Sequence, residues 1–311
     1  MRNTIAAVSL VLFSIQMIVI ELTAQTLPEA KTVKPQLFMT GLEFAEGPAF
    51  DKSGNFYVVN YRRNGTIGRV TPNGTASILV DLYAQEHLQP ETRANGLKVD
   101  AEGYIIAAAR KHLLRISPDG KSVVSLVGDY QGEDFDFLND VALDPQGNIY
   151  FSDARGGNVY RLDGQSKKVT RILENRAFPN GLGVSPNGKY FCQAESQKRR
   201  VIIFDMQSDG TLKNERVLFE FPNPSPFADV QGEPDGMIFD NQGRLYQTSW
   251  LGETIYVIDV PSGKLLRSYW AGGSKNTNVH FLKGSLYTTV AAKEAVFRLE
   301  LGIDGWDYNR P

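Results

Sequence analysis

The sequence predicts an all-β fold, namely a six-bladed β-propeller of four-stranded antiparallel blades. Three observations lead to this prediction. A strand, turn and strand unit occurs six times, the copies are one blade apart, and no segment shows a convincing amphipathic helical pattern. The chain has 311 residues, of which 42% are hydrophobic and 22% charged, so it is long enough for one large all-β domain.

Each copy of the repeat contains a small or apolar strand, a polar turn that ends in glycine, and a second strand. The first copy runs from Ala49 to Tyr57. The turn glycines are 41 to 55 residues apart, which is the length of one blade: Gly54, Gly103, Gly147, Gly188, Gly243 and Gly284. In four copies an aspartate stands three residues before the glycine: Asp51, Asp100, Asp144 and Asp240. Such an aspartate bonds its own turn backbone, while the glycine tolerates a positive φ.

The ring is predicted to close through the N-terminal part of the domain. The sixth copy is followed by only one more strand, from Ala295 to Leu301, which leaves the last blade one strand short. The segment from Gln36 to Thr40 precedes the first copy and can supply the missing strand. Residues 25–311 are therefore predicted to form a single propeller domain.

Residues 1–24 are predicted to be a signal peptide. Arg2 precedes an apolar run from Ile5 to Ile20, and small or neutral residues then offer a cleavage site before Gln25. An uncleaved membrane anchor is the alternative, because the run approaches the minimum length of a spanning helix. Under both interpretations the folded domain is exported, either to a periplasm or to the outside of the cell.

The overall charge excludes some classes of partner. The formal net charge is -2, so the chain has no field that would recruit nucleic acid or an acidic membrane surface. We therefore expect a small-molecule partner, no nucleic acid, and no membrane contact beyond the export segment. Cys192 is the only cysteine, which rules out an internal disulfide, and its strand-like surroundings predict a buried, inert thiol.

Oxygen-bearing side chains form a column eight residues before the repeat glycine in five copies: Glu46, Asn95, Asn139, Asn180 and Asp235. The first strand of each propeller blade lines the central channel, so equivalent residues meet at one channel mouth. Carboxylates and amides without clustered cysteines or paired histidines suit a hard cation such as Ca²⁺ rather than zinc. The alternative is that these residues only cap turns at strand entries, although glutamate is a poor turn residue.

Four motifs of the chain resemble, in order, those of the family of senescence marker protein, gluconolactonase and luciferin-regenerating enzyme. They are Ala45-Glu46-Gly47-Pro48, Leu138-Asn139-Asp140-Val141, Phe178-Pro179-Asn180-Gly181-Leu182 and Pro234-Asp235-Gly236-Met237. The likeness runs from about Leu37 to Leu301. The last blade, with Thr277-Asn278-Val279-His280-Phe281, looks especially like diisopropylfluorophosphatase, a related calcium propeller.

The resemblance implies four ligands of a catalytic Ca²⁺ ion: Glu46, Asn139, Asn180 and Asp235. It also makes Asp235 the expected catalytic residue, as a general base or a direct nucleophile. We expect four residues to contact substrate: Asn95, Asp140, Trp250 and His280. For His280 the alternative is a packed or solvated residue without a role.

Two positions depart from the family patterns. The sugar lactonases nearest to senescence marker protein have an arginine where this chain has Phe137, and that arginine grips sugar hydroxyls. The diisopropylfluorophosphatase branch has an aspartate for a second calcium where this chain has Ile238. We therefore expect a single ion in the channel.

Hydrolysis of a small lactone is the function that the sequence favours, with the ion acting as a Lewis acid. Hydrolysis of a phosphotriester or phosphofluoridate at the same site is one alternative. The other is a non-catalytic exported propeller, in which a structural calcium holds the channel and outer loops bind a partner.

Overall fold

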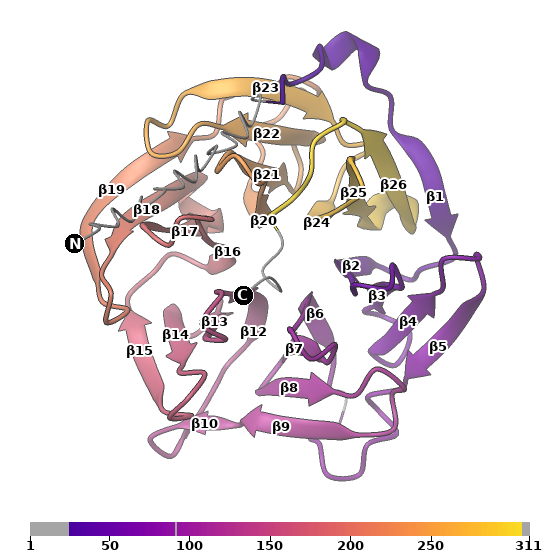
Figure 1. Cartoon of the computed structure of the whole chain (residues 1–311), viewed down its shortest axis with the longest axis vertical. Coiled ribbons are helices and arrows are strands. Elements are labelled where there is room, and N and C mark those ends of the chain that lie inside the picture. Colours follow the sequence, from indigo (N-terminus) through magenta and orange to yellow (C-terminus); the bar gives the residue numbers. More distant parts are fainter. Residues whose placement is uncertain (1–24, 91, 307–311) are drawn as a thin grey trace, which may run out of the picture.

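The computed structural model describes residues 25–90 and 92–306, so the predicted signal peptide at 1–24 lies outside the described residues. Six four-stranded antiparallel sheets stand around a central axis, which confirms the predicted propeller (Figure 1). Within the described ranges, no helix has the length and apolar character needed to cross a membrane. The described part of the chain also contains three short 3-10 turns: η1 (Ala30–Thr32), η2 (Ser196–Lys198) and η3 (Ala291–Lys293).

The first three blades follow one another along the chain. Blade 1 contains β2 (Ala45–Phe50), β3 (Phe56–Asn60), β4 (Thr66–Val70) and β5 (Ala76–Val80). Blade 2 contains β6 (Ala94–Val99), β7 (Ile105–Ala109), β8 (His112–Ile116) and β9 (Val123–Val127). A small hairpin, β10 (Asp129–Tyr130) and β11 (Glu133–Asp134), leads to blade 3. Blade 3 contains β12 (Leu138–Leu143), β13 (Ile149–Asp153), β14 (Asn158–Leu162) and β15 (Val169–Leu173).

The other three blades complete the ring. Blade 4 contains β16 (Pro179–Val184), β17 (Tyr190–Glu195), β18 (Arg200–Met206) and β19 (Leu212–Glu220). Blade 5 contains β20 (Pro234–Phe239), β21 (Leu245–Ser249), β22 (Thr254–Ile258) and β23 (Leu265–Trp270). Blade 6 contains β24 (Asn276–Leu282), β25 (Ser285–Val290), β26 (Ala295–Glu300) and, at its outer edge, β1 (Gln36–Thr40). The first strand of each blade lies nearest the axis in Figure 1.

The turn between the two inner strands forms as the repeat predicts. In blade 1, Oδ1 of Asp51 accepts hydrogen bonds from the backbone N–H groups of Ser53 and Asn55, both at 2.9 Å. Gly54 follows with φ of 83°, a conformation that glycine adopts without a steric penalty. Because the same chemistry recurs at Asp100, Asp144 and Asp240, most blades begin with the same hairpin.

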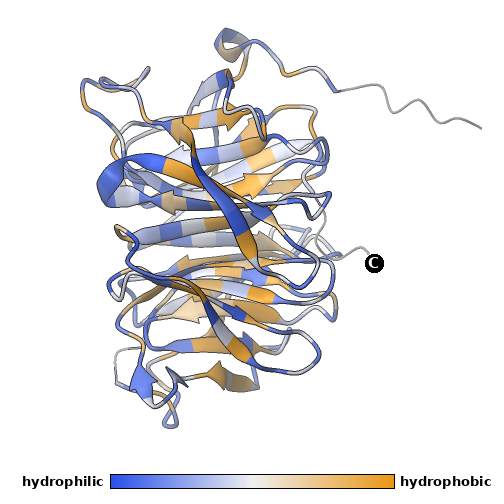
Figure 2. Cartoon of the chain, turned by 90° about the vertical axis from the view of Figure 1, so that its left-hand side faces the viewer, coloured by the Kyte–Doolittle hydropathy of each residue, from blue (hydrophilic) through white to orange (hydrophobic). Residues whose placement is uncertain are grey.

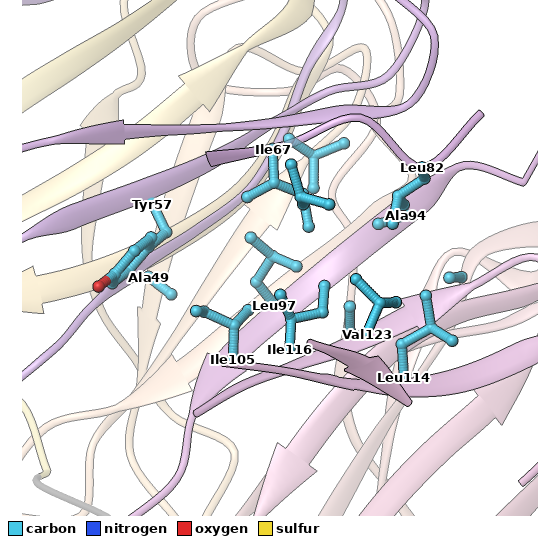
Figure 3. Packing of buried hydrophobic residues seen from close by; sticks show 14 of the residues in the cluster. Ala49, Tyr57, Ile67, Leu82, Ala94, Leu97, Ile105, Leu114, Ile116 and Val123 are labelled. Atoms are coloured by element: carbon cyan, nitrogen blue, oxygen red, sulfur yellow. The ribbon is translucent and has the colours of Figure 1, made fainter. Parts of the chain in front are cut away.

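The hydrophobic core is divided into six clusters, one between each pair of neighbouring blades. Figure 3 shows the cluster between blades 1 and 2, where Tyr57 and Ile67 face Leu97 and Ile116. In the side view of Figure 2, hydrophobic and hydrophilic residues alternate along the strands, as expected for sheets that pack face to face. Cys192 is fully buried in one of these clusters, and burial raises the pKa of its thiol, which confirms the prediction of an inert cysteine.

Ring closure depends on β1, which pairs antiparallel with β26 from Gln36 opposite Arg298 to Thr40 opposite Ala295. The Phe38 ring packs edge-on against Phe56 of blade 1 at 5.3 Å and against Tyr287 of blade 6 at 5.0 Å between ring centroids. One side chain of β1 therefore joins the first blade to the last. The prediction that the N-terminal strand completes the last blade is confirmed.

We expect Phe38→Ala to lower the free energy of unfolding by about 1–2 kcal/mol, because it removes both aromatic contacts across the closing joint. Leu37→Ala is the matched control in the same strand. Leu37 is 60% exposed, so its truncation should change stability by less than about 0.5 kcal/mol. Urea unfolding followed by tryptophan fluorescence measures both values. Equal losses for the two variants would show that Phe38 does not join the blades.

Candidate functional site

The five residues of the predicted column meet at one mouth of the channel, where they line a cavity of about 380 Å³: Glu46, Asn95, Asn139, Asn180 and Asp235. We call these five the oxygen ring. Each lies in the innermost strand of its blade, close to a shift in the pairing register with the next strand. In β20, for example, the shift falls between Pro234 and Met237, so Asp235 has no partner in the ladder. Such a bulge bends the strand and redirects the side chain.

Hydrogen bonds from the neighbouring strand hold the bulge at Asp235. The Nε2 group of Gln247 donates to the backbone carbonyls of Asp235 and Gly236, at 3.0 Å each. The hydroxyl of Thr248 donates to the carbonyl of Gly236 at 2.9 Å. The side chains of Gln247 and Thr248 are fully buried, so these bonds stabilise the bulge with little competition from water. The Asp235 carboxylate is thus carried on a fixed backbone.

A layer of glycines lies one residue further along the inner strands. Gly47, Gly96, Gly181 and Gly236 follow ring residues in four blades, and a Cβ atom on any of them would collide with a neighbouring strand. The equivalent residues in the other two blades are Asp140 and Asn278. At Gly96 a Cβ would collide with the Asp140 carboxylate, and at Gly236 it would collide with the Asn278 amide. The glycines therefore make room for these two side chains beneath the oxygen ring.

Asp140 lies in this layer and is only 1% exposed. Its Oδ1 accepts a hydrogen bond from Nδ2 of Asn278 at 3.3 Å, and its backbone N–H donates to the Ser152 hydroxyl at 3.0 Å. It does not line the cavity, so the structure does not place it where we expected it to contact substrate. Asp140 instead adds a buried negative charge directly beneath the oxygen ring.

The two ring carboxylates oppose each other's ionisation. Burial, followed by the charge of Asp140, raises the pKa of Glu46 to about 8. The pKa of Asp235 is raised well above its ordinary value by burial, then by the charges of Glu46 and Asp140, while the Asn180 side chain opposes the rise. Neighbouring carboxylates in a dry site behave in this way unless a cation compensates them.

The side chains of the oxygen ring fit a calcium ion. Asn180 is 6% exposed, yet its Oδ1 atom has no hydrogen-bond partner in the described chain, which leaves a buried acceptor directed at no donor. No group of three histidine, cysteine, aspartate or glutamate side chains is placed to hold a metal within the described ranges. An ion here would need amide oxygens beside Glu46 and Asp235, and that mixture of ligands is typical of Ca²⁺.

Aromatic side chains form the wall of the cavity above the oxygen ring: Phe44, Tyr61, Phe137, Phe178 and Trp250. The Phe44 ring lies 5.7 Å from Trp250 and 5.6 Å from Tyr61 between centroids. Phe44 and Phe178 have positive φ values of 69° and 56°, which are uncommon for bulky residues and point to a conformation held by its surroundings. Of these residues, the sequence predicts Trp250 as a substrate contact and Phe137 at the position of the sugar-binding arginine. Three of the aromatic residues stand two positions before a ring residue, and that spacing could have revealed them.

His280 lies elsewhere. It lines a second cavity, together with Lys98 and Ile238, and it is not among the residues around the oxygen ring. The structure therefore brings together six of the eight expected site residues, places Asp140 beneath them, and separates His280 from them. The reason is the position of His280 on β24, three residues beyond Thr277, which is the equivalent of the ring residues in blade 6.

Residues 44–292 match the family model described as "SMP-30/Gluconolactonase/LRE-like region". This chain belongs to that family. The match begins at the cavity wall and covers the oxygen ring and all six inner strands. The predicted resemblance is thereby confirmed.

Named relatives agree with this membership. The chain is 26% identical to the gluconolactonase of Zymomonas mobilis over 257 residues, covering 74% of this chain and 70% of that one. It is 25% identical to the diisopropyl-fluorophosphatase of Loligo vulgaris over 293 residues, covering 82% and 88%. Among solved structures, regucalcin of Agrobacterium tumefaciens, described as a calcium-binding protein, superposes with a TM-score of 0.71 at 17% identity, covering 88% and 95%. The two relatives have the names of hydrolases, and the regucalcin likeness shows a shared fold.

We predict that the calcium-free protein becomes more stable on acidification. Glu46 has a pKa of about 8 in the folded chain against 4.5 as its ordinary value, so the folded state binds a proton that the unfolded state releases between these values. The resulting destabilisation is absent below about pH 4.5, grows as the pH rises to about 8, and is constant above. Urea unfolding in the presence of a chelator, repeated at several pH values, measures this change in the free energy of unfolding.

Glu46→Gln should flatten this pH dependence, whereas Glu86→Gln, on the exposed surface, should leave it unchanged. Added Ca²⁺ should stabilise the wild type most at alkaline pH, where both carboxylates must otherwise ionise side by side. Identical pH profiles for the wild type and Glu46→Gln in chelator would contradict the electrostatic account.

Proposed function

We propose that this chain is an exported, calcium-dependent hydrolase of a small lactone, acting in the cavity above the oxygen ring. The observation that carries the proposal is the convergence of two half-buried carboxylates and three amides at the bottom of an aromatic cavity of about 380 Å³. A cavity of this size takes a small ring or ester. The gluconolactonase name of a relative that shares most of the chain supports a lactone as the substrate class.

Four side chains of the oxygen ring would hold the ion: Glu46, Asn139, Asn180 and Asp235. Calcium supplies a Lewis acid, which polarises a carbonyl and stabilises the negative charge that develops on its oxygen. The buried Oδ1 of Asn180 gains a partner in this arrangement, and the charges of Glu46 and Asp235 are compensated.

Asp235 would act either as the general base or as the nucleophile. Its carboxylate opens onto the cavity and is held by the bulge that Gln247 and Thr248 stabilise. As a general base it would take a proton from the water that attacks the carbonyl carbon, which breaks the ring C–O bond. As a nucleophile it would attack the carbonyl carbon itself and release the ring oxygen as an alcohol, and water would then hydrolyse the acyl-enzyme. Both roles require the ionised carboxylate, which a neighbouring dication favours.

The remaining cavity residues would orient the substrate. Asn95 is 5% exposed and offers a side-chain amide beside the carboxylates. Trp250 and Phe44 present ring faces that suit the carbon skeleton of a small lactone and exclude water from it. Phe137 stands where sugar lactonases nearest to senescence marker protein carry an arginine, so the substrate we propose is less polar than a sugar lactone.

Hydrolysis of a phosphotriester or phosphofluoridate is a second candidate. It is favoured by the likeness to the diisopropyl-fluorophosphatase of Loligo vulgaris, which covers 82% of this chain. The same oxygen ring and the same carboxylate would serve a phosphoryl oxygen in place of a carbonyl. Relative rates on lactones and phosphotriesters decide between the two candidates.

We expect hydrolysis of at least one lactone in a panel of aliphatic and sugar lactones, aryl esters and phosphotriesters, followed by pH-stat titration. Chelator should abolish the activity and Ca²⁺ should restore it. At saturating Ca²⁺, Asp235→Asn should lower the rate by about 100-fold or more, because it removes the base or nucleophile. Asp129→Asn, on the outer hairpin, should leave the rate unchanged.

Three results would reject parts of this proposal. If Asp235→Asn bound Ca²⁺ and kept full activity, the role of Asp235 would be wrong. If phosphotriesters were hydrolysed faster than every lactone, the second candidate would replace the first. If no substrate were hydrolysed while chelation still lowered the thermal stability, the chain would be a non-catalytic propeller with a structural ion.

We also propose that residues 1–24 are a cleaved export signal, on the basis of the apolar run from Ile5 to Ile20. Expression of the full chain with its own N-terminus should yield exported protein that begins at Gln25, as measured by intact-mass spectrometry. Replacing Leu10 and Leu12 with arginine should hold the chain in the cytoplasm at its full mass. Membrane-bound protein of full mass from the wild-type sequence would instead establish an anchor.

A further inference from the structure

A second cavity, of about 500 Å³, lies at the other end of the inner strands. Among the inner-strand residues that line it are Lys98 of blade 2, Ile238 of blade 5 and His280 of blade 6. The glycine layer, with Asp140 and Asn278, lies between these residues and the oxygen ring along the strands. The two cavities share no residue.

Lys98 is a buried cation without a partner. It is 3% exposed, and its Nζ atom makes no hydrogen bond and no ion pair with any described residue. Burial lowers the pKa of its ammonium group, and the charge of Asp140 opposes that change. A lysine is rarely buried unless it is paired, because removing an ammonium from water costs several kcal/mol. An anion in the cavity beside Nζ would supply the missing partner.

His280 presents a hydrogen-bond acceptor to the same cavity. Its Nδ1 atom lies 2.9 Å from the Phe281 carbonyl oxygen, and a carbonyl can only accept, so Nδ1 carries the proton. Burial, followed by the charge of Lys98, lowers the pKa of His280 to about 3, which keeps the ring neutral. The Nε2 atom of a neutral ring with this tautomer is an acceptor and suits a hydroxyl donor.

The rest of the cavity carries both signs of charge at its edge and is apolar on its sides. Lys52 and Lys283 line it without an ion pair to any residue in the described ranges. The carboxylate of Asp304 accepts a hydrogen bond from the Gly284 backbone at 3.0 Å, and that of Asp51 is engaged in its own turn. Apolar side chains supply the walls: Phe50, Leu143, Ile238, Phe281 and Trp306.

We propose that this cavity is a second binding site and that it takes a small hydroxycarboxylate. The carboxylate pairs with Nζ of Lys98, the hydroxyl donates to Nε2 of His280, and the carbon chain lies against the apolar walls. A hydroxycarboxylate is also what a lactone yields on hydrolysis. That connection rests on the proposed function, whereas the binding site rests only on Lys98, His280 and the cavity around them.

Isothermal titration calorimetry, with 6-hydroxyhexanoate added to the calcium-free protein, tests this proposal. Without calcium, the acid has no ion to bind at the oxygen ring. We expect saturable binding to one site, weaker binding of hexanoate, and no binding of 1-hexanol. Lys98→Met should weaken binding of both acids by at least about 10-fold, since it removes the charge and keeps the length of the side chain. Lys121→Met, on the exposed surface, is the matched control.

His280→Phe tests the hydroxyl contact independently of the carboxylate contact with Lys98. It should bring the affinities for 6-hydroxyhexanoate and hexanoate to the same value, because only the hydroxyl contact is lost. Asp235→Asn should bind both acids as the wild type does, so a failure of the proposed hydrolase function would leave this result unaffected. Equal affinity in the wild type and Lys98→Met, or no binding of either acid, would overturn the proposal.

If Lys98→Met does not fold, the wild-type protein still provides a test. Calcium-free crystals soaked in 6-bromohexanoate should show anomalous scattering from bromine in the cavity that Lys98 lines. Bromine found only among the aromatic residues above the oxygen ring, or no bromine at all, would show that the second cavity is not a carboxylate site.

Discussion

The close approach of six inner strands to one axis is the constraint on which the rest of this structure depends. The strands come so near to one another that a Cβ atom has no space at Gly47, Gly96, Gly181 or Gly236. Because these four positions lack side chains, Asp140 and Asn278 can extend across the axis. The same approach brings the five residues of the oxygen ring from separate blades to one cavity, although they are far apart in the sequence.

This crowding concentrates charge along the channel. Glu46 and Asp235 open onto one cavity, Asp140 lies beneath them, and Lys98 follows towards the second cavity. Burial raises the pKa of all three carboxylates, and the charges of Glu46 and Asp140 raise the pKa of Asp235 further. The single ammonium of Lys98 cannot compensate three carboxylates. Such an arrangement favours a cation at one end of the channel and leaves a buried ammonium at the other. The propeller is therefore polarised along its axis.

Much of the fold and of the candidate site was predictable from the sequence, because the patterns that reveal them lie within short segments of the chain. The hairpin turn appears as aspartate and glycine three residues apart, and counting back from the glycine finds the oxygen ring in five blades. The same count misleads in blade 6, where the turn at Lys283 and Gly284 is shorter and β24 runs longer. There the ladder aligns Thr277 with Asp235, so His280 belongs to the second cavity. The burial of Lys98 was not predictable, since it depends on residues from other blades that come together only in the folded ring.

The closure of the ring through β1 has a consequence for how the chain is made. Strand β1 pairs with β26, so the first strand of the domain to leave the ribosome needs the last one as its partner. Until β26 has been made, β1 has no partner, and its unpaired N–H and C=O groups are where strands from other chains can add. The N-terminal strand thus gains its partner only in the last step of folding, and a chaperone that shields unpaired strands would act before that step.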